Sequence, residues 1–333
     1  RPGAPMPIQP ATPAAVAQAA HWLRDGRVVG VPTETVYGLA ADAANAGGVA
    51  AIYRIKGRPA DHPLIVHVLD LDQAAWWADL DELAVALGKA FWPGPLTLIV
   101  RRRAQAPAFA CGGEPTIGLR VPSHPVARAL LSAFSALGGR GLAAPSANRF
   151  GKVSPTRAEH VHDDLGDDVG LILDGGDCPV GVESTIVDLS RPTATLLRPG
   201  GIDAADIERV LGTPLAARDA QAPRASGTLA AHYAPHTPLE LLAPAALLAR
   251  AAVLAAMGQR TVSWSVHPPP AGRWLAAPAD PATYAHVLYD TLRSLDGIGV
   301  DRILVEVPPA GTAWDAVHDR LGRAAATFSE SRP

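Results

Sequence analysis

Residues 12–211 alternate between short apolar runs and longer stretches in which apolar positions recur at helical spacing. Thr12 followed by Pro13 is an N-cap signal, and the alanine-rich run behind it reaches Asp25 and stops at Gly26, so both ends of a first helix are marked. The pattern predicts further helices over residues 47–55, 80–91 and 125–137. It predicts strands over residues 28–31, 64–68, 96–100, 117–121, 142–144, 170–173, 185–189 and 195–197. This mixture indicates one α/β domain over residues 12–211, with a twisted mixed sheet flanked by helices.

Residues 212–238 interrupt the pattern, because they are rich in Ala, Pro, Gly and Thr and show neither a helical nor a strand period. We interpret them as an interdomain linker. Beyond it, predicted strands over residues 239–242, 261–266 and 302–307 alternate with predicted helices over residues 245–257, 282–295 and 314–326. In the middle helix six residues share one face: Tyr284, Val287, Leu288, Thr291, Leu292 and Leu295. The alternation predicts a smaller Rossmann-like domain with a parallel sheet over residues 239–333.

The composition is that of a globular protein, with 333 residues, 48% hydrophobic and 18% charged. The chain has no run of 18 or more apolar residues, so we expect a soluble protein without a membrane span. Its net charge of -3 argues against a nucleic-acid polyanion as the main ligand. The two cysteines, Cys111 and Cys178, exclude a disulfide framework and fit a reducing, cytoplasmic compartment. Residues 1–11 lack the apolar core of a signal peptide, and we expect them to be disordered or an added leader before Met6.

Two polar clusters follow predicted elements at points where α/β folds usually bind ligands. The first is PTETVYG at residues 32–38, which also fits a polar turn between two buried strands. The second is KGRP at residues 56–59, followed by His62 and His67. Basic residues at the end of a helix are also favourable for the helix alone. Neither cluster is diagnostic by itself.

Three further segments carry the same residue types. Thr116 and Arg120 are four apart in a predicted strand, so both point to one face. The segment APSAN at residues 144–148, Ser154, Ser184 and Arg198 lie at strand ends, where turn and N-cap roles are the alternative. The chain contains no GxxxxGK[ST], GxGxxG, HExxH or GxSxG motif. Pro235 separates His232 from His236 on any helix, so the spacing does not favour a zinc site.

Taken in order, eight motifs resemble those of the YrdC-like threonylcarbamoyl-AMP synthases. They are PTETVYGLA at residues 32–40, KGRP at 56–59, PLIVHV at 63–68, PGPLT at 93–97, IGLRVP at 117–122, APSAN at 144–148, ESTIVD at 183–188 and LRPG at 197–200. HYAP at residues 232–235, before an α/β tail, resembles the longer two-domain branch of that family.

The resemblance implies a reaction in which L-threonine, bicarbonate or CO2 and ATP give threonylcarbamoyl-AMP and pyrophosphate. A separate tRNA threonylcarbamoyl-transferase complex would use the product, with weak or no direct tRNA binding by this chain. No covalent nucleophile is required, so positioning and charge neutralisation by Lys, Arg, hydroxyls and Mg2+ suit the chemistry. No protein metal site is expected.

The resemblance also implies site residues. L-threonine would be held by Thr35, His67, Arg120, Ala144 and Ser184. ATP would be surrounded by Lys56, Arg58, His62, Thr116, Ser146, Asn148, Ser154, Arg198 and Tyr233. Lys56 and Arg58 are our candidates for the catalytic contacts to the α-phosphate and the departing pyrophosphate. Family members often carry Asn where this chain has His62, and the linker is hypothesised to act as a lid.

Two alternatives remain at this stage. A first domain that only clasps RNA would need basic stripes, and the chain has one short run at residues 101–103. Carbamoyl transfer from carbamoyl phosphate, as in the related domain of hydrogenase-maturation proteins, accompanies cysteine-rich zinc modules that two cysteines cannot build.

Overall fold

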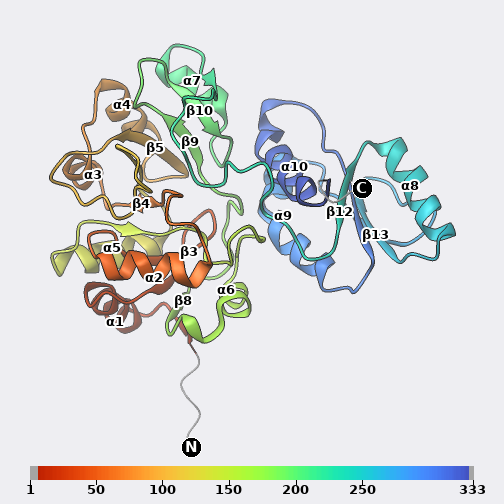
Figure 1. Ribbon diagram of the computed structural model, residues 1–333, viewed down its shortest axis with the longest axis horizontal. Helices are drawn as coiled ribbons and strands as arrows, with labels where there is room; N and C mark the ends of the chain where they lie inside the picture. Colours follow the sequence, from red (N-terminus) through yellow and green to blue (C-terminus); the bar gives the residue numbers. More distant parts are fainter. Residues whose placement is uncertain (1–6, 330–333) are drawn as a thin grey trace, which may run out of the picture. The chain divides into compact units, whose positions relative to one another are not determined.

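A computed structural model describes residues 7–329 of the chain (Figure 1). The described residues divide into two compact units, which are treated separately below. The first contains residues 7–150 and 154–228, and the second contains residues 151–153 and 229–329. The division between 228 and 229 lies inside the stretch interpreted as a linker.

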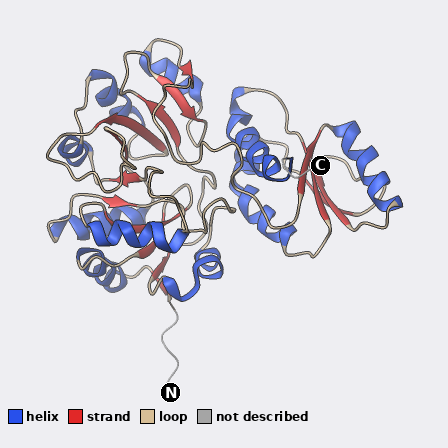
Figure 2. Ribbon diagram, viewed as in Figure 1, coloured by secondary structure: helices blue, strands red, loops and turns tan. Residues whose placement is uncertain are grey.

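The first unit is built on one mixed eleven-stranded sheet in the order β1-β8-β2-β3-β7-β4-β6-β5-β9-β10-β11. Its strands are β1 (Ile8–Pro10), β2 (Val29–Pro32), β3 (Tyr37–Asp42), β4 (Ile65–His67), β5 (Leu96–Arg101), β6 (Thr116–Arg120), β7 (Leu142–Ala143), β8 (Ile172–Asp174), β9 (Thr185–Asp188), β10 (Thr195–Arg198) and β11 (Ala216–Ala217). Its α-helices are α1 (Pro13–Arg24), α2 (Ala46–Lys56), α3 (Leu71–Trp77), α4 (Glu82–Phe91), α5 (Pro125–Ala136), α6 (Ala158–Leu165) and α7 (Ala204–Leu211). The predicted mixed sheet flanked by helices is confirmed (Figure 2).

Local sequence signals explain where several helices begin and end. In α1 the side chain of Thr12 accepts a hydrogen bond from the Ala15 amide, and Pro13 occupies the first turn. Asn45 caps α2 in the same way through Gly48, and Gly57, with φ of 64°, ends that helix in the left-handed conformation. The end of α2 delivers Lys56 and the residues after it to the site described below.

Helices cover both faces of the first sheet. On one face, α1 and α5 lie side by side over β2 and the neighbouring strands (Figure 1). The opposite face packs against α2, α3, α4 and α6. Alternation along the strands divides the side chains between the two cores, as where Leu39 and Ala41 face one core and Ala40 the other.

The second unit is a four-stranded sheet in the order β12-β15-β13-β14, and all its strand pairs are parallel. The strands are β12 (Leu239–Leu242), β13 (Thr261–Ser265), β14 (Arg273–Ala276) and β15 (Arg302–Glu306), and the helices are α8 (Pro244–Ala256), α9 (Pro281–Asp296) and α10 (Asp315–Ser329). The predicted parallel sheet is therefore confirmed. On α9, Tyr284, Leu288, Leu292 and Leu295 are buried as the helical spacing predicts, and Tyr289 is buried in addition.

Some elements differ from the predictions. Residues 8–10 were expected outside the fold, but they form β1, which pairs in parallel with β8 and extends the edge of the sheet. The rest of that prediction, residues 1–6, falls outside the described residues. No range was predicted for β3, β14, α3, α6 or α7, because these elements are short, weakly periodic or exposed. Within the proposed linker, β11 pairs with β10.

Candidate active site

Neighbouring strands at the centre of the first sheet bring predicted site residues to one face. His67 on β4 is the register partner of Arg120 on β6, and paired residues on adjacent strands point the same way. Thr116 and Gly118 share the face of Arg120 because they lie four and two residues before it on the strand. Gly118 lies opposite Ile99, and a Cβ there would sit 3.1 Å from the Ile99 Cδ1 atom. With glycine at position 118, no side chain occupies this face of β6 between Thr116 and Arg120.

A buried ion pair joins Arg120 to the turn between β2 and β3. Arg120 contacts the Glu34 carboxylate through Nη2 and donates to the Thr35 hydroxyl through Nη1 at 2.9 Å. The second carboxylate oxygen of Glu34 accepts from the amide and the hydroxyl of Ser123, at 2.8 Å and 2.6 Å. Burial raises the pKa of Glu34, but Arg120 and the Ser123 hydrogen bonds outweigh it, so the pKa lies below its ordinary value.

His67 is held beside this ion pair as a neutral imidazole. Burial, with a contribution from the Arg120 guanidinium, lowers the pKa of His67 to about 3. Its Nδ1 atom is buried and has no hydrogen-bond partner among residues 7–329. A neutral ring nitrogen of this kind can accept a hydrogen bond from a ligand.

The depressed pKa of His67 should appear in the pH dependence of stability. The unfolded chain protonates this histidine below pH 6.5, the ordinary value, whereas the folded protein does not until about pH 3. The stability contributed by the neutral ring is therefore complete above pH 6.5 and is lost as the pH falls toward 3. We expect the difference in free energy of unfolding, wild type minus His67→Gln, to fall by about 1.4 kcal/mol per pH unit below pH 6. Urea titrations at several pH values would measure it, and a pH-independent difference would contradict the assignment.

Arg198 and Ser184 form a second group on the same unit. The Ser184 carbonyl accepts from Arg198 Nε at 3.1 Å and from Nη2 at 2.8 Å, while the Ser184 hydroxyl lies 2.7 Å from the Thr97 hydroxyl. Arg198 Nη1 donates to the backbone carbonyl of Ser226 at 3.0 Å. Ser184 is thus placed between the end of β10 and the start of β5.

Ser226 also contacts Arg58, so it connects two residues that were predicted to bind ATP, Arg58 and Arg198. Arg58 Nη2 donates to the Ser226 hydroxyl at 3.3 Å and to the Pro63 carbonyl at 2.8 Å. Nearby, Arg224 forms ion pairs with Asp61 at 2.8 Å and with Glu114 at 2.9 Å. The last residues of the proposed linker that belong to this unit therefore lie against the face that carries Thr116, and they leave a cavity of about 10 Å³ there.

Lys56 is almost completely buried, with 2% of its surface exposed. Its Nζ donates to the carbonyl oxygens of Ser146 and Asn148, at 2.6 Å and 2.7 Å, which ties the end of α2 to the segment at residues 144–148. Burial lowers the pKa of Lys56 well below its ordinary value, and Arg58 adds to this effect. An incoming phosphate would favour the protonated form.

Three further predicted residues, Ser154, Ala144 and His62, each contact another residue of this unit. Ser154 donates to the Glu183 carboxylate at 2.5 Å. The Ala144 amide donates to the Ile65 carbonyl at 3.2 Å, and Ala144 itself is buried. The His62 ring packs edge-on against Phe150 with centroids 5.3 Å apart, and burial, with Arg58, lowers its pKa.

Comparisons with known proteins agree with this architecture. A family described as "Telomere recombination" matches residues 21–200, and one described as "Threonylcarbamoyl-AMP synthase, C-terminal domain" matches residues 202–326. A Bacillus subtilis protein named threonylcarbamoyl-AMP synthase is 40% identical over 326 residues, which cover 93% of this chain and 92% of that protein. The chain belongs to the threonylcarbamoyl-AMP synthase family. It is an enzyme, and a nucleotidyltransferase reaction fits the family name.

Other members of the threonylcarbamoyl-AMP synthase family give the same result. A Pyrococcus abyssi protein of that name is 42% identical over 223 residues, covering 65% of this chain and 64% of that protein. A solved structure titled as P. abyssi Sua5 complexed with L-threonine superposes with a TM-score of 0.88 at 34% identity, covering 96% of both chains. The fold of this family member is therefore that of Sua5.

The second unit of this family member holds Tyr233, the remaining predicted ATP ligand. Tyr233 is buried, with φ of 60°, and its ring lies 5.3 Å from the Arg320 guanidinium carbon and 5.8 Å from the Tyr289 ring. The proposed contact of Tyr233 with ATP stays a prediction.

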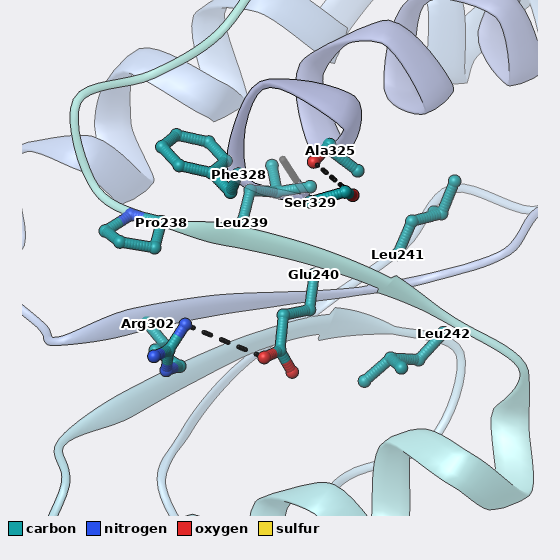
Figure 3. A pocket seen from close by; sticks show the side chains of 9 residues that line it. All are labelled: Pro238, Leu239, Glu240, Leu241, Leu242, Arg302, Ala325, Phe328 and Ser329. Carbon is teal, nitrogen blue, oxygen red and sulfur yellow. Dashed lines mark hydrogen bonds and ion pairs between the residues drawn. The ribbon is translucent and has the colours of Figure 1, made fainter. Parts of the chain in front are cut away.

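A cavity of about 570 Å³ also lies in the second unit, between β12 and the end of α10. Figure 3 shows Arg302 directed at Glu240 in this cavity, with Phe328 and Ser329 contributed by α10. No predicted site residue lines it.

Among residues 7–329 there is no group of three or more His, Cys, Asp or Glu side chains that could hold a metal, and no helix long and apolar enough to cross a membrane.

Four residues that contact the candidate site were not singled out from the sequence: Glu34, Thr97, Ser123 and Ser226. The sequence could have predicted an ion pair for Glu34, because this carboxylate lies inside the motif PTETVYGLA next to predicted buried strands, where it needs a cation as partner. The other three are ordinary hydroxyl residues whose contacts come from distant parts of the chain.

Proposed function

We propose that the protein is an L-threonylcarbamoyladenylate synthase, which converts L-threonine, bicarbonate or CO2, and ATP into threonylcarbamoyl-AMP and pyrophosphate. The observation that carries the proposal is the burial in one unit of Arg58, Arg120 and Arg198, two of them bridged by Ser226. Several buried guanidinium groups in one unit suit phosphate and carboxylate substrates, because each can donate charge-assisted hydrogen bonds to an anion. The P. abyssi structure with L-threonine supports the choice of amino acid.

The chemistry assigns each group a task. The threonine amine combines with bicarbonate, with loss of water, to give a carbamate, whose oxygen attacks the α-phosphorus of ATP while pyrophosphate departs. Arg120 and Thr35, which are hydrogen-bonded to each other, would hold the threonine carboxylate, and the Nδ1 atom of neutral His67 would accept a hydrogen bond from the substrate. Lys56 and Arg58 would neutralise charge on the α-phosphate and the leaving pyrophosphate. Positioning accounts for most of the expected rate acceleration.

Mg2+ would enter with the nucleotide as MgATP. The guanidinium, ammonium and hydroxyl groups around the site suit the phosphates of the nucleotide. The product would pass to a tRNA threonylcarbamoyl-transferase complex. A reducing, cytoplasmic location suits the buried cysteines Cys111 and Cys178, which form no disulfide with each other.

Pyrophosphate release from ATP tests the proposal, with threonine and bicarbonate omitted in turn. We expect release to need all three substrates and the adenylate product to carry label from [14C]bicarbonate. Release with carbamoyl phosphate in place of threonine and bicarbonate, or RNA binding without ATP turnover, would refute it.

We also propose that residues 212–238 act as a lid on the nucleotide site, because residues 224–226 contact Arg58 and the face that carries Thr116. Deletion of residues 212–333 should lower turnover by more than tenfold, since it removes Ser226 and Tyr233 together and opens the site to water. Steady-state pyrophosphate assays on the full and shortened chains, each checked for folding by circular dichroism, would measure this. Comparable activity would refute the lid.

A further inference from the structure

Glu34 stands out because the proposed mechanism has no task for it, although it is the direct partner of the residue that would bind the threonine carboxylate. It is buried, and its carboxylate contacts Arg120. Two hydrogen bonds from Ser123 fix the other oxygen. A carboxylate held this way keeps both its position and its negative charge.

The charges around Arg120 show what Glu34 changes. Among residues 7–329, the groups with the largest electrostatic effect on Arg120 are Glu34, Arg198 and Cys178, and His67 also interacts with it. Burial raises the pKa of Cys178, so its thiol is neutral, and His67 is neutral as well. Arg198 is occupied by the Ser184 carbonyl. Glu34 is therefore the negative charge that balances Arg120.

Without Glu34, a buried guanidinium beside the Thr35 hydroxyl would attract small anions in general. The Arg120 guanidinium has five N–H groups. One on Nη2 contacts Glu34, one on Nη1 donates to Thr35, and Nε donates to the Gly94 carbonyl at 3.4 Å. Among residues 7–329, Nη1 and Nη2 each make one hydrogen bond, so each can donate a second one to a ligand carboxylate. Bicarbonate, a proposed cosubstrate, is such an anion and would compete for the same place.

We propose that Glu34 is a specificity-determining residue that makes the Arg120 subsite select a zwitterionic amino acid over a simple anion. This inference rests on the proposed function. A ligand carboxylate bound to Arg120 shares its guanidinium group with the Glu34 carboxylate, so the two negative charges repel each other. In an amino acid the ammonium group cancels most of that repulsion, because its charge lies within a few bonds of the carboxylate. In a carboxylic acid without an amine nothing cancels it.

The test compares two ligands in two proteins by calorimetry without ATP: L-threonine, and 3-hydroxybutyrate, which has the same skeleton without the amino group. In Glu34→Gln the preference for threonine, expressed as the ratio of the two dissociation constants, should fall about tenfold or more because the anion is no longer repelled. Bicarbonate should also become a competitor of threonine. Glu34→Asp, which keeps the charge, should retain the preference.

Glu240→Gln is the matched control. Glu240 is also a largely buried carboxylate in an ion pair, with Arg250 at 2.8 Å, but it lies in the second unit. Its variant should leave the ligand ratio unchanged. Glu34→Gln should lower the melting temperature in either case, because it breaks the ion pair with Arg120. If Glu34 is only structural, the variant binds both ligands with an unchanged ratio of dissociation constants, and this result overturns the proposal.

If Glu34→Gln does not fold, the inference can still be tested with the wild-type protein. Acetate and 3-hydroxybutyrate should fail to displace threonine even at concentrations about 100-fold above the dissociation constant of threonine. Displacement of threonine by either anion at or below that concentration would overturn the inference. A wild-type protein that binds no threonine at all would instead refute the proposed function, so the two failures are distinguishable.

Discussion

Arg120→Met should lower the free energy of unfolding by about 3–5 kcal/mol, the usual cost of removing one partner from a buried ion pair. Arg120 is 3% exposed and Glu34 is 4% exposed, so water cannot replace the lost guanidinium. The Ser123 hydrogen bonds would remain but would leave one carboxylate oxygen without its cation. Urea unfolding at pH 7.5 would measure the loss.

The double variant Arg120→Met with Glu34→Gln separates charge from packing. Because it removes both charges, it should recover part of the stability lost in Arg120→Met, and the double-mutant cycle would report the coupling between the two residues. Arg209→Met is the matched control, since Arg209 is a largely exposed partner of Asp206 on α7 and should matter little. A loss below about 1 kcal/mol in Arg120→Met would contradict the role of the ion pair.

Arg58→Ala should reduce turnover by about ten- to a hundredfold or more. A charge-assisted hydrogen bond contributes about 1.5–3 kcal/mol, and each 1.36 kcal/mol of barrier is tenfold in rate. In the free protein Arg58 donates to backbone carbonyls and to Ser226, so an arriving phosphate would replace partners rather than recruit a side chain from solvent. Single-turnover pyrophosphate release would separate this effect from product release.

Folding must be controlled in that experiment, because Arg58→Ala also removes internal hydrogen bonds. Arg58→Lys keeps a positive charge but loses the planar fork, so it should recover only part of the rate. Arg103→Ala removes a surface arginine paired with Asp79 at 2.9 Å and should leave turnover unchanged. Near-normal turnover of a folded Arg58→Ala would remove Arg58 from the phosphate site.

The sequence predicted the elements whose signals are local. Both ends of α1 were readable from Thr12 and Gly26, and the three predicted strands and three predicted helices of the second unit fell close to their ranges, whereas the exposed β14 was not predicted. The helices α3, α6 and α7 have only 7 or 8 residues, too few for a helical period to stand out. Their formation depends on packing against the sheet rather than on their own propensity.

The candidate site likewise combines features that the sequence predicts with contacts that only the folded chain creates. The sequence by itself determined which residue types are available, the alternation that sends Thr116 and Arg120 to one face, and the family resemblance of the ordered motifs. Only the tertiary structure decided that Glu34 meets Arg120, 86 residues away, and that Ser226 meets Arg58, 168 residues away. Such partners carry no local pattern, because they are chosen when strand order and burial bring distant segments together and each buried charge must find a counter-charge.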